Sequence, residues 1–412
     1  IPISISLGIV AVLPGAFDTS FTASAGYVIR SMVGGIDSFP LLAVPMFVLA
    51  GILMAHGKIS EKLFDVFVYF LGNKRAGIPC AVIITCLFYG AISGSAPATV
   101  AAVGSMTIPL LIELGYEKDF STAIVAVAGG LGVIIPPSIP FIMYAMATGE
   151  SVSDLFLAGI VPGMMISALL IFYAYYYCRR HGEDREKIQA KMDQLKEKGF
   201  FNILKESIWA LLSPVIVLGC IYTGVASPTE AAVISVFYSL FVSLFIYKSI
   251  KVKQIWGIMV EAMKTYAPIL FILATSTAFS RVLTLMQVPQ DVSAWIMTHF
   301  SNEIVLLLVI NVVLLIVGMV MDTTPAILIL SPILLPIVQH VGMNPIHFGV
   351  MMIVNLAVGF VTPPVGVNLF VASSLTNVPM MQIAKKAMPM IGYFLLALLL
   401  IAFIPAISLC LL

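Results

Sequence analysis

The sequence predicts an all-α polytopic membrane protein, with about nine transmembrane helices and two re-entrant hairpins in an inverted repeat. Three observations predict this fold class. Hydrophobic residues make up 60% of the 412 residues and charged residues only 10%, whereas soluble domains carry about 25% charged residues. Apolar stretches of about 20 residues, enough to cross a lipid core of about 30 Å, recur along the chain. Segments with the same glycine and proline spacing occur twice.

The predicted crossings follow from the apolar stretches. They are 1–16, 38–57, 119–148, 160–178, 203–224, 228–248, 265–285, 344–375 and 388–411. Because the chain begins at Ile1 and not at methionine, we expect Ile1–Leu13 to be the end of a longer first span rather than a signal peptide. Three shorter amphipathic segments are predicted to lie at the membrane interface: Ser20–Val33, Ile59–Phe70 and Val288–Phe300.

Two further apolar stretches, 79–114 and 303–340, are too long for one crossing. Polar residues and prolines interrupt each of them near the middle. We therefore predict that each is a re-entrant hairpin, which enters and leaves the membrane on the same side.

Lysine and arginine predict the orientation, because cytoplasmic loops of membrane proteins are enriched in them. With these crossings and hairpins, all of the 21 basic residues except Arg30 and Arg281 fall on one side. We assign that side to the cytoplasm, which predicts a multi-pass protein of the bacterial inner membrane. Reading either hairpin as one crossing would place the following basic clusters on the wrong side.

The chain is predicted to divide into two halves around one polar segment. Residues 1–178 form the first inverted repeat and 253–412 the second. Between them, 179–202 form a cytoplasmic linker and 203–252 form scaffold helices. The linker contains the strongly polar run Arg179–Lys198, whose mixed charges are typical of a solvated segment.

The internal repeat has a constant offset of 227 residues. Pro136–Pro137 pairs with Pro363–Pro364, and the same offset pairs Gly132 with Gly359. A weaker similarity between Pro45–Gly51 and Ile269–Thr275 needs a slightly different offset. Prolines and small residues in membrane helices often serve only packing. Packing does not require matched breaks in both halves, however, so we predict a function for them.

The first hairpin turns at a segment rich in small and hydroxyl residues. Gly94 permits unusual backbone angles, and Pro97 fits the first turn of a new helix. A turn at membrane depth leaves backbone groups unpaired, so it must be buried in protein or line a watery cavity. Carbonyl and hydroxyl oxygens at such a turn suit a hard cation such as Na⁺, and the helix start near Pro97 suits an anion.

The second half repeats this plan with one carboxylate added. Its hairpin is predicted to turn at Gly318–Pro325, and its broken span contains Pro363–Pro364. Asp322 lies about twenty residues into an apolar run, and an ionisable group at such depth is a candidate functional residue. It could bind a cation, relay a proton or polarise a substrate group.

Other classes of function have little support in the sequence. The net charge of +1 gives no indication of nucleic-acid binding. The five cysteines and five histidines are dispersed, without metal-ligand spacing. Asp322 and Ser95 are the only candidate catalytic groups, and no histidine, lysine or second buried aspartate is placed to activate them. An intramembrane enzyme is therefore a remote alternative, and we expect the protein not to be an enzyme.

Four blocks of sequence resemble the large membrane subunit of TRAP (tripartite ATP-independent periplasmic) transporters. They are Phe88–Leu111, Gly129–Ala145, Ser227–Ala232 and Gly359–Ala372. The resemblance covers essentially the whole chain, although Ser227 stands where that family usually has threonine. It implies an elevator-type transporter, in which hairpins and broken helices form a transport domain that moves on a scaffold domain.

The resemblance also implies binding residues. The first sodium site would use Ser93, Gly94, Ser95, Gly132 and Pro136. The second would use Asp322, Thr323, Thr324, Gly359, Thr362 and Pro363. Many of these contacts would come from backbone carbonyls. For the substrate we predict contacts at Ser95, Pro97, Thr99, Ser138 and Asn368.

The function implied is sodium-coupled uptake of an organic acid anion, either sialic acid or a C4-dicarboxylate. The coupling ion would be Na⁺, and no other cofactor is expected. The implied partners are a small four-helix TRAP membrane subunit and a periplasmic substrate-binding protein. The alternative is a self-sufficient sodium- or proton-coupled anion symporter, which would work without a binding protein.

Overall fold

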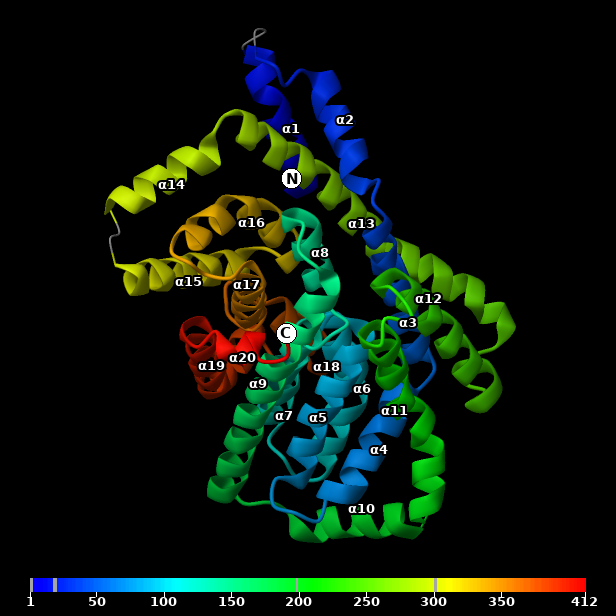
Figure 1. Cartoon of the computed structure of the whole chain (residues 1–412). Helices are drawn as coiled ribbons and strands as arrows, with labels where there is room; N and C mark the ends of the chain where they lie inside the picture. The colour runs from blue at the N-terminus through cyan, green and yellow to red at the C-terminus, as the bar shows by residue number, and fades with distance from the viewer. Residues whose placement is uncertain (1–2, 18–20, 198, 300–301) are drawn as a thin grey trace.

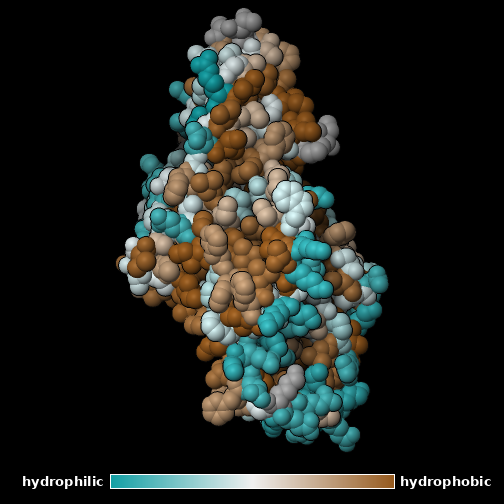
Figure 2. Space-filling view, turned by 90° about the vertical axis from the view of Figure 1, so that its right-hand side faces the viewer, coloured by the Kyte–Doolittle hydropathy of each residue, from teal (hydrophilic) through white to brown (hydrophobic). Residues whose placement is uncertain are grey.

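The computed structural model describes residues 3–17, 21–197, 199–299 and 302–412, and within these ranges every regular element is helical. Nine helical segments of this described part are long and apolar enough to cross a membrane. Figure 2 shows hydrophobic residues over much of the surface and hydrophilic residues gathered at the lower end. The predicted all-α polytopic fold is confirmed.

The first half follows the predicted boundaries closely, except at the start of α9. Its elements are α1 (Ile3–Phe17), α2 (Ala25–Ile36), η1 (Phe39–Leu42), α3 (Ala43–His56), α4 (Ile59–Leu71), α5 (Gly77–Ser93), α6 (Ala96–Glu113), α7 (Lys118–Ala128), η2 (Gly129–Val133), α8 (Ile139–Thr148) and α9 (Val152–His181). The predicted first hairpin is the antiparallel pair α5–α6. The predicted broken span is α7, η2 and α8.

The second half begins after α10 (Arg185–Glu197), which lies in the predicted linker and at the lower end of Figure 1. Its elements are α11 (Phe200–Tyr222), α12 (Pro228–Phe241), η3 (Val242–Ile246), α13 (Val252–Leu285), α14 (Val288–His299), α15 (Glu303–Val320), α16 (Thr323–His340), α17 (Pro345–Gly359), α18 (Val367–Thr376), α19 (Met380–Phe403) and α20 (Ala406–Leu409). The second hairpin is α15–α16, and the second broken span is α17 and α18.

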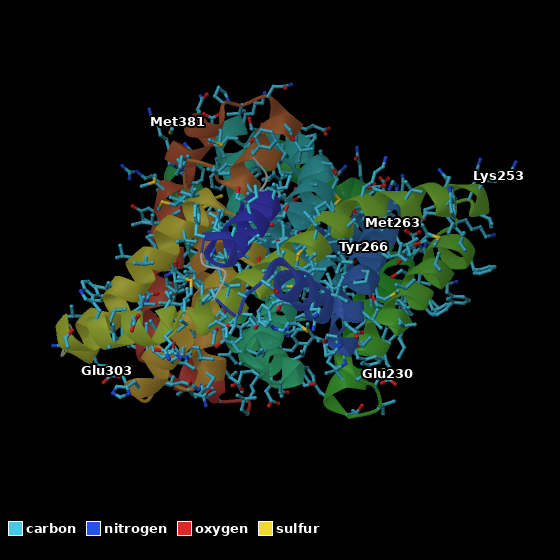
Figure 3. The ribbon with its side chains drawn as sticks, turned by 90° about the horizontal axis from the view of Figure 1, so that it is seen from above. Glu230, Lys253, Met263, Tyr266, Glu303 and Met381 are labelled. Carbon is cyan, nitrogen blue, oxygen red and sulfur yellow. The ribbon has the colours of Figure 1, made fainter. Side chains whose placement is uncertain are left out.

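Two crossings are longer than predicted, and a third is shifted, since α19 is Met380–Phe403 where 388–411 was predicted. Helix α9 begins at Val152 and not at 160, because the Ser151 hydroxyl caps it by accepting the Asp154 N–H at 3.3 Å. Helix α13 begins at Val252 and has 34 residues, which gives a length of about 51 Å. Figure 3 shows α13 running across the molecule from Lys253 at one edge past Met263 and Tyr266. Such a helix must tilt strongly to stay within a core of about 30 Å.

The residues predicted to lie at the interface form helices over 25–33, 59–70 and 288–299. Residues 21–24 precede α2 and are not helical, and 20 and 300 fall outside the described residues. Helix α2 packs against α13, and α14 joins α13 to the second hairpin (Figure 1). Helix α4 lies along α5 and α11, where the Ser207 hydroxyl donates to the Lys62 carbonyl at 2.8 Å. It buries one face there, including Leu63 and Phe64. The buried face of α4 is therefore held by packing against α5 and α11.

The same chain path occurs in both halves. Lys58 lies between α3 and α4, Gln287 lies between α13 and α14, and both residues have a left-handed φ of 58°. Each is followed by a short helix, α4 or α14, and then by a hairpin and a broken span. Both broken spans contain a cis proline–proline bond, at Pro136–Pro137 and Pro363–Pro364.

The two broken spans lie antiparallel to each other. Tyr144, on the second part of the first span, donates its hydroxyl to the carbonyl of Pro345, at the start of the second span, at 2.7 Å. Asn368, on the second part of the second span, donates its side-chain amide to the carbonyl of Ala126, on the first part of the first span, at 3.0 Å. The early part of each span therefore contacts the late part of the other, as an inverted repeat requires.

Candidate functional site

The tip of the first hairpin is a tight turn with its own hydroxyl network. Gly94 ends α5 with a left-handed φ of 61°, and the extended Ser95 precedes α6. The Ser93 and Thr99 hydroxyl oxygens lie 3.0 Å apart. Thr99 also donates to the Ser95 carbonyl at 2.8 Å. The turn thus brings together three oxygen atoms that could bind a cation, two from hydroxyl groups and one from a carbonyl.

This tip rests directly on the first helix break. A methyl group on Gly132 would lie 2.5 Å from the Thr99 hydroxyl oxygen and 2.8 Å from the Ser95 carbonyl oxygen, so only glycine fits there. The Ile139 N–H, just after the break, donates to the Gly94 carbonyl at 3.2 Å. The structure therefore brings together the predicted residues Ser93, Gly94, Ser95 and Gly132.

Two more predicted residues of the first half lie within the break. Pro136 is buried and precedes the cis bond to Pro137. The Ser138 hydroxyl donates to the Val133 carbonyl at 2.6 Å and caps α8 by accepting the Phe141 N–H. Ser138 therefore shapes the break through local bonds, and its role in substrate binding stays a prediction.

The second hairpin tip rests on the second break through backbone atoms. A methyl group on Gly359 would lie 2.3 Å from the Gly318 carbonyl carbon, so the helices touch there. The Val365 N–H donates to the Met319 carbonyl at 3.1 Å. The Asp322 carboxylate caps α16 by accepting the Thr323 N–H at 2.7 Å. The hairpin tip that carries Asp322 is therefore in direct contact with the second helix break.

The remaining predicted residues differ in how they are held. Thr324 is buried in the first turn of α16, and Pro363 precedes the cis bond of the second break. The Thr362 hydroxyl donates to the Val358 carbonyl at 2.8 Å within its own helix end. Pro97 lies half-buried at the start of α6. Asn368 is fully buried against α7, so its predicted contact with substrate would need that packing to open.

Two further contacts hold the site, and the first of them was missing from the prediction. Helix α3 crosses the first hairpin tip, where a methyl group on Gly51 would lie 3.2 Å from the Ser93 Cα, and Tyr89 donates its hydroxyl to the Gly51 carbonyl at 3.3 Å. Behind the second break, Asn355 donates its side-chain amide to the Asn311 side chain at 2.9 Å. The weak similarity of Pro45–Gly51 to Ile269–Thr275 was the one sequence signal for the α3 contact.

Both sites present oxygen atoms that could bind a cation, and both lie near the start of a helix. Oxygen ligands suit Na⁺ as a hard cation, and the exposed N–H groups of a helix start suit an acid group. The arrangement can therefore bind a cation and an anion close together.

Comparison with known proteins gives the family. The model of the DctM component of the tripartite ATP-independent periplasmic transporter matches residues 1–407. The isethionate TRAP transporter permease protein DctMQ of Oleidesulfovibrio alaskensis is 43% identical over 99% of this chain and 63% of its own length, so the chain spans under two thirds of that relative. The C4-dicarboxylate TRAP transporter large permease protein DctM of Pseudomonas aeruginosa is 39% identical over 91% of the chain and 86% of its own length.

Two solved structures share the fold. The YdaH transporter of Alcanivorax borkumensis has a TM-score of 0.66 at 14% identity, over 97% of this chain and 96% of that one. MtrF of Neisseria gonorrhoeae has a TM-score of 0.66 at 15% identity, over 97% and 93%. The relatives are named as transporter permeases and not as enzymes. This multi-pass inner-membrane chain belongs to the DctM family of large permease components of tripartite ATP-independent periplasmic transporters.

Proposed function

We propose that this chain forms the membrane pathway of a sodium-coupled importer for an organic acid anion. It works with a small four-helix membrane subunit and receives its substrate from a periplasmic binding protein. The observation that carries the proposal is the matched pair of hairpin tips, each resting on a helix break through a glycine. We call the contact of the first tip with Gly132 the first seat, and the contact of the second tip with Gly359 the second seat.

The coupling ion is assigned to these two seats. The first offers the Ser93 and Thr99 hydroxyls and the Ser95 carbonyl. The second offers the Asp322 carboxylate, which is a stronger ligand for a cation because it carries a charge. Binding of Na⁺ would stiffen each tip against its break, and so prepare the substrate site between the helix starts.

The substrate class follows from the family and from the helix starts. Relatives are named for isethionate, C4-dicarboxylates and 2,3-diketo-L-gulonate, all of which are organic acids. The N–H groups at the starts of α6 and α16 suit an acid group. Bound Na⁺ would offset part of the anion's charge within the membrane.

The movement proposed is of elevator type. The hairpins and broken spans move together, because each tip is bonded to its break through Ile139–Gly94 and Val365–Met319. The sliding contact lies between α3 and the first hairpin, where Gly51 faces Ser93. Small residues at this contact permit the close packing that a shear movement requires.

Reconstitution tests the proposal directly. The chain is placed in proteoliposomes with its small subunit, and uptake of radiolabelled substrate is measured with the loaded binding protein outside. We expect uptake with an inward Na⁺ gradient and little uptake when K⁺ replaces Na⁺ at equal ionic strength. Full uptake driven by a proton gradient alone would exclude sodium coupling. Full uptake of free substrate without the binding protein would favour the self-sufficient symporter.

A further inference from the structure

A cavity of about 530 Å³ lies between α2, α8, α13 and α16. This volume is within the range of pockets that hold small molecules, about 300–1,000 Å³. Its wall combines Gly34 and Ser38 from the segment around α2 with Ser280 and Arg281 from α13. The cavity is separate from the two glycine seats described above.

Two helices in the cavity wall lead to the predicted sites. Leu328 of α16 lines it, six residues after Asp322, which corresponds to about 9 Å along the helix. Ala145 and Met146 of α8 line it as well, and α8 starts at the first break. A molecule in this cavity therefore contacts the elements that carry both hairpin seats.

Arg281 gives the cavity a positive charge. Its guanidinium lies over Gly34, where a methyl group would be 3.6 Å from the nearer nitrogen. Arg281 has no salt bridge in the part of the chain that the structure describes. With the predicted crossings and hairpins, it is one of only two basic residues on the non-cytoplasmic side. The other, Arg30, does not line the cavity.

The rest of the lining is neutral or acidic. Ser38, Thr277 and Ser280 contribute hydroxyl groups. Glu150, two residues after α8, contributes a carboxylate. An anion with one acid group could place it against Arg281 and its neutral polar part against the hydroxyls. A second acid group in the same space would meet the negative charge of Glu150, which is unfavourable at short range.

We propose that this cavity is a binding site for small organic monoanions on the non-cytoplasmic side, where Arg281 binds the acid group and Glu150 disfavours dianions. The site holds the anion before it reaches the hairpin tips. The inference rests on the proposed function for its ligand class. Its test requires neither a Na⁺ gradient nor transport, so the two can fail independently.

A thiol at residue 280 reports the charge of the cavity. Ser280→Cys replaces the hydroxyl oxygen next to Arg281 with sulfur. The assembled permease that carries this variant is treated with an anionic or a cationic methanethiosulfonate reagent. Modification of that residue is followed by mass spectrometry, which separates it from the native cysteines. We expect Arg281→Gln to lower the ratio of anionic to cationic rates about tenfold or more. The matched control, Arg30→Gln, removes the same charge from the same side and should change the ratio less than about threefold.

Protection by ligands tests the specificity. Isethionate is the monoanion probe and succinate the dianion probe, each at millimolar concentration. We expect isethionate to slow modification at residue 280 several-fold more than succinate does, and Glu150→Gln to reduce this difference. Arg281→Lys should keep part of the protection, and Arg281→Gln should remove it.

Three results of these labelling experiments would overturn the proposal. They are equal effects of Arg30→Gln and Arg281→Gln on the rate ratio, no protection by isethionate, or equal protection by both probes in the unaltered chain. Ser38→Cys on the facing wall provides a second reporter if the first variant does not assemble. Dependence on Arg281 that occurs only when the binding protein is present would also overturn it, since Arg281 would then contact that protein.

Discussion

The two hairpin seats share one plan but lie in different surroundings. Residues 131–140 around the first break are all buried, and so are Ser93 and Thr99. At the second seat, Asp322, Pro364 and Val365 are exposed. The same turn chemistry therefore produces an enclosed site in one half and an open site in the other.

The difference comes from the helix that covers the tip. In the first half, Gly51 of α3 packs against Ser93. The weak repeat pairs Gly51 with Thr275 of α13, and Thr275 instead lies near Gly8 of α1. Local sequence thus specifies each turn, while a third helix sets how far the rest of the chain covers it.

The largest expected effect comes from filling the glycine seats. Gly132→Ala and Gly359→Ala should each lower uptake at least about tenfold, because the added methyl groups meet atoms at 2.5 and 2.3 Å and overpacking costs about 1–3 kcal/mol. Gly359→Ala should be the more severe, since backbone atoms cannot move aside as a threonine side chain can. Uptake into proteoliposomes measures both.

Two matched variants control for the loss of glycine itself. Gly219 and Gly392 lie in membrane helices, and an added methyl group would meet nothing within 4 Å at either position, so alanine should be tolerated there. If all four alanine variants reduced uptake alike, the seats would have no special role.

The second expected effect concerns the unequal ligands. Ser95 stands in the first tip where Asp322 stands in the second. Asp322→Asn should raise the Na⁺ concentration for half-maximal uptake about tenfold, because a charged ligand is lost. Ser95→Ala should raise it less than about threefold, since the Ser95 carbonyl remains. Equal shifts in the Na⁺ dependence of the two variants would contradict the asymmetry.

Much of the fold was predictable because the residues at each hairpin turn and helix break themselves determine the local backbone. Gly94, the Pro136–Pro137 pair and their counterparts lie where the structure turns, and the hairpin 303–340 is observed as α15–α16 with the predicted ends. The early start of α9 was not predictable from hydrophobicity, because its capping residue, Ser151, lies outside the apolar run that marks the crossing.

The candidate site was less predictable because its contacts join distant segments. No periodicity indicates that Gly51 faces Ser93, or that Asn368 bonds to Ala126 rather than facing open space. The sequence places Arg281 near a span end and indicates no role for it, yet it lines a cavity built from four helices. Such a cavity exists only once the helices are packed.

The third expected effect tests exposure directly. Val365→Cys and Thr99→Cys place thiols at the open and the enclosed seat. The thiol at residue 365 should react with a polar maleimide at least about tenfold faster, because the reaction requires an accessible thiolate. The rates are measured by mass spectrometry on the assembled permease. Similar rates would mean that the first seat opens as readily as the second.

The smallest expected effect concerns the hydroxyls beside the prolines. Ser138 both caps α8 and donates to the Val133 carbonyl, whereas Thr362 donates only to Val358 within its own helix end. Ser138→Ala should therefore destabilise the protein by about 1 kcal/mol, and Thr362→Val by less than about 0.5 kcal/mol. Thermal unfolding in detergent compares them. A larger loss for Thr362→Val would show that the open seat depends on its hydroxyl more than the enclosed seat does, and would reverse the comparison between the two halves.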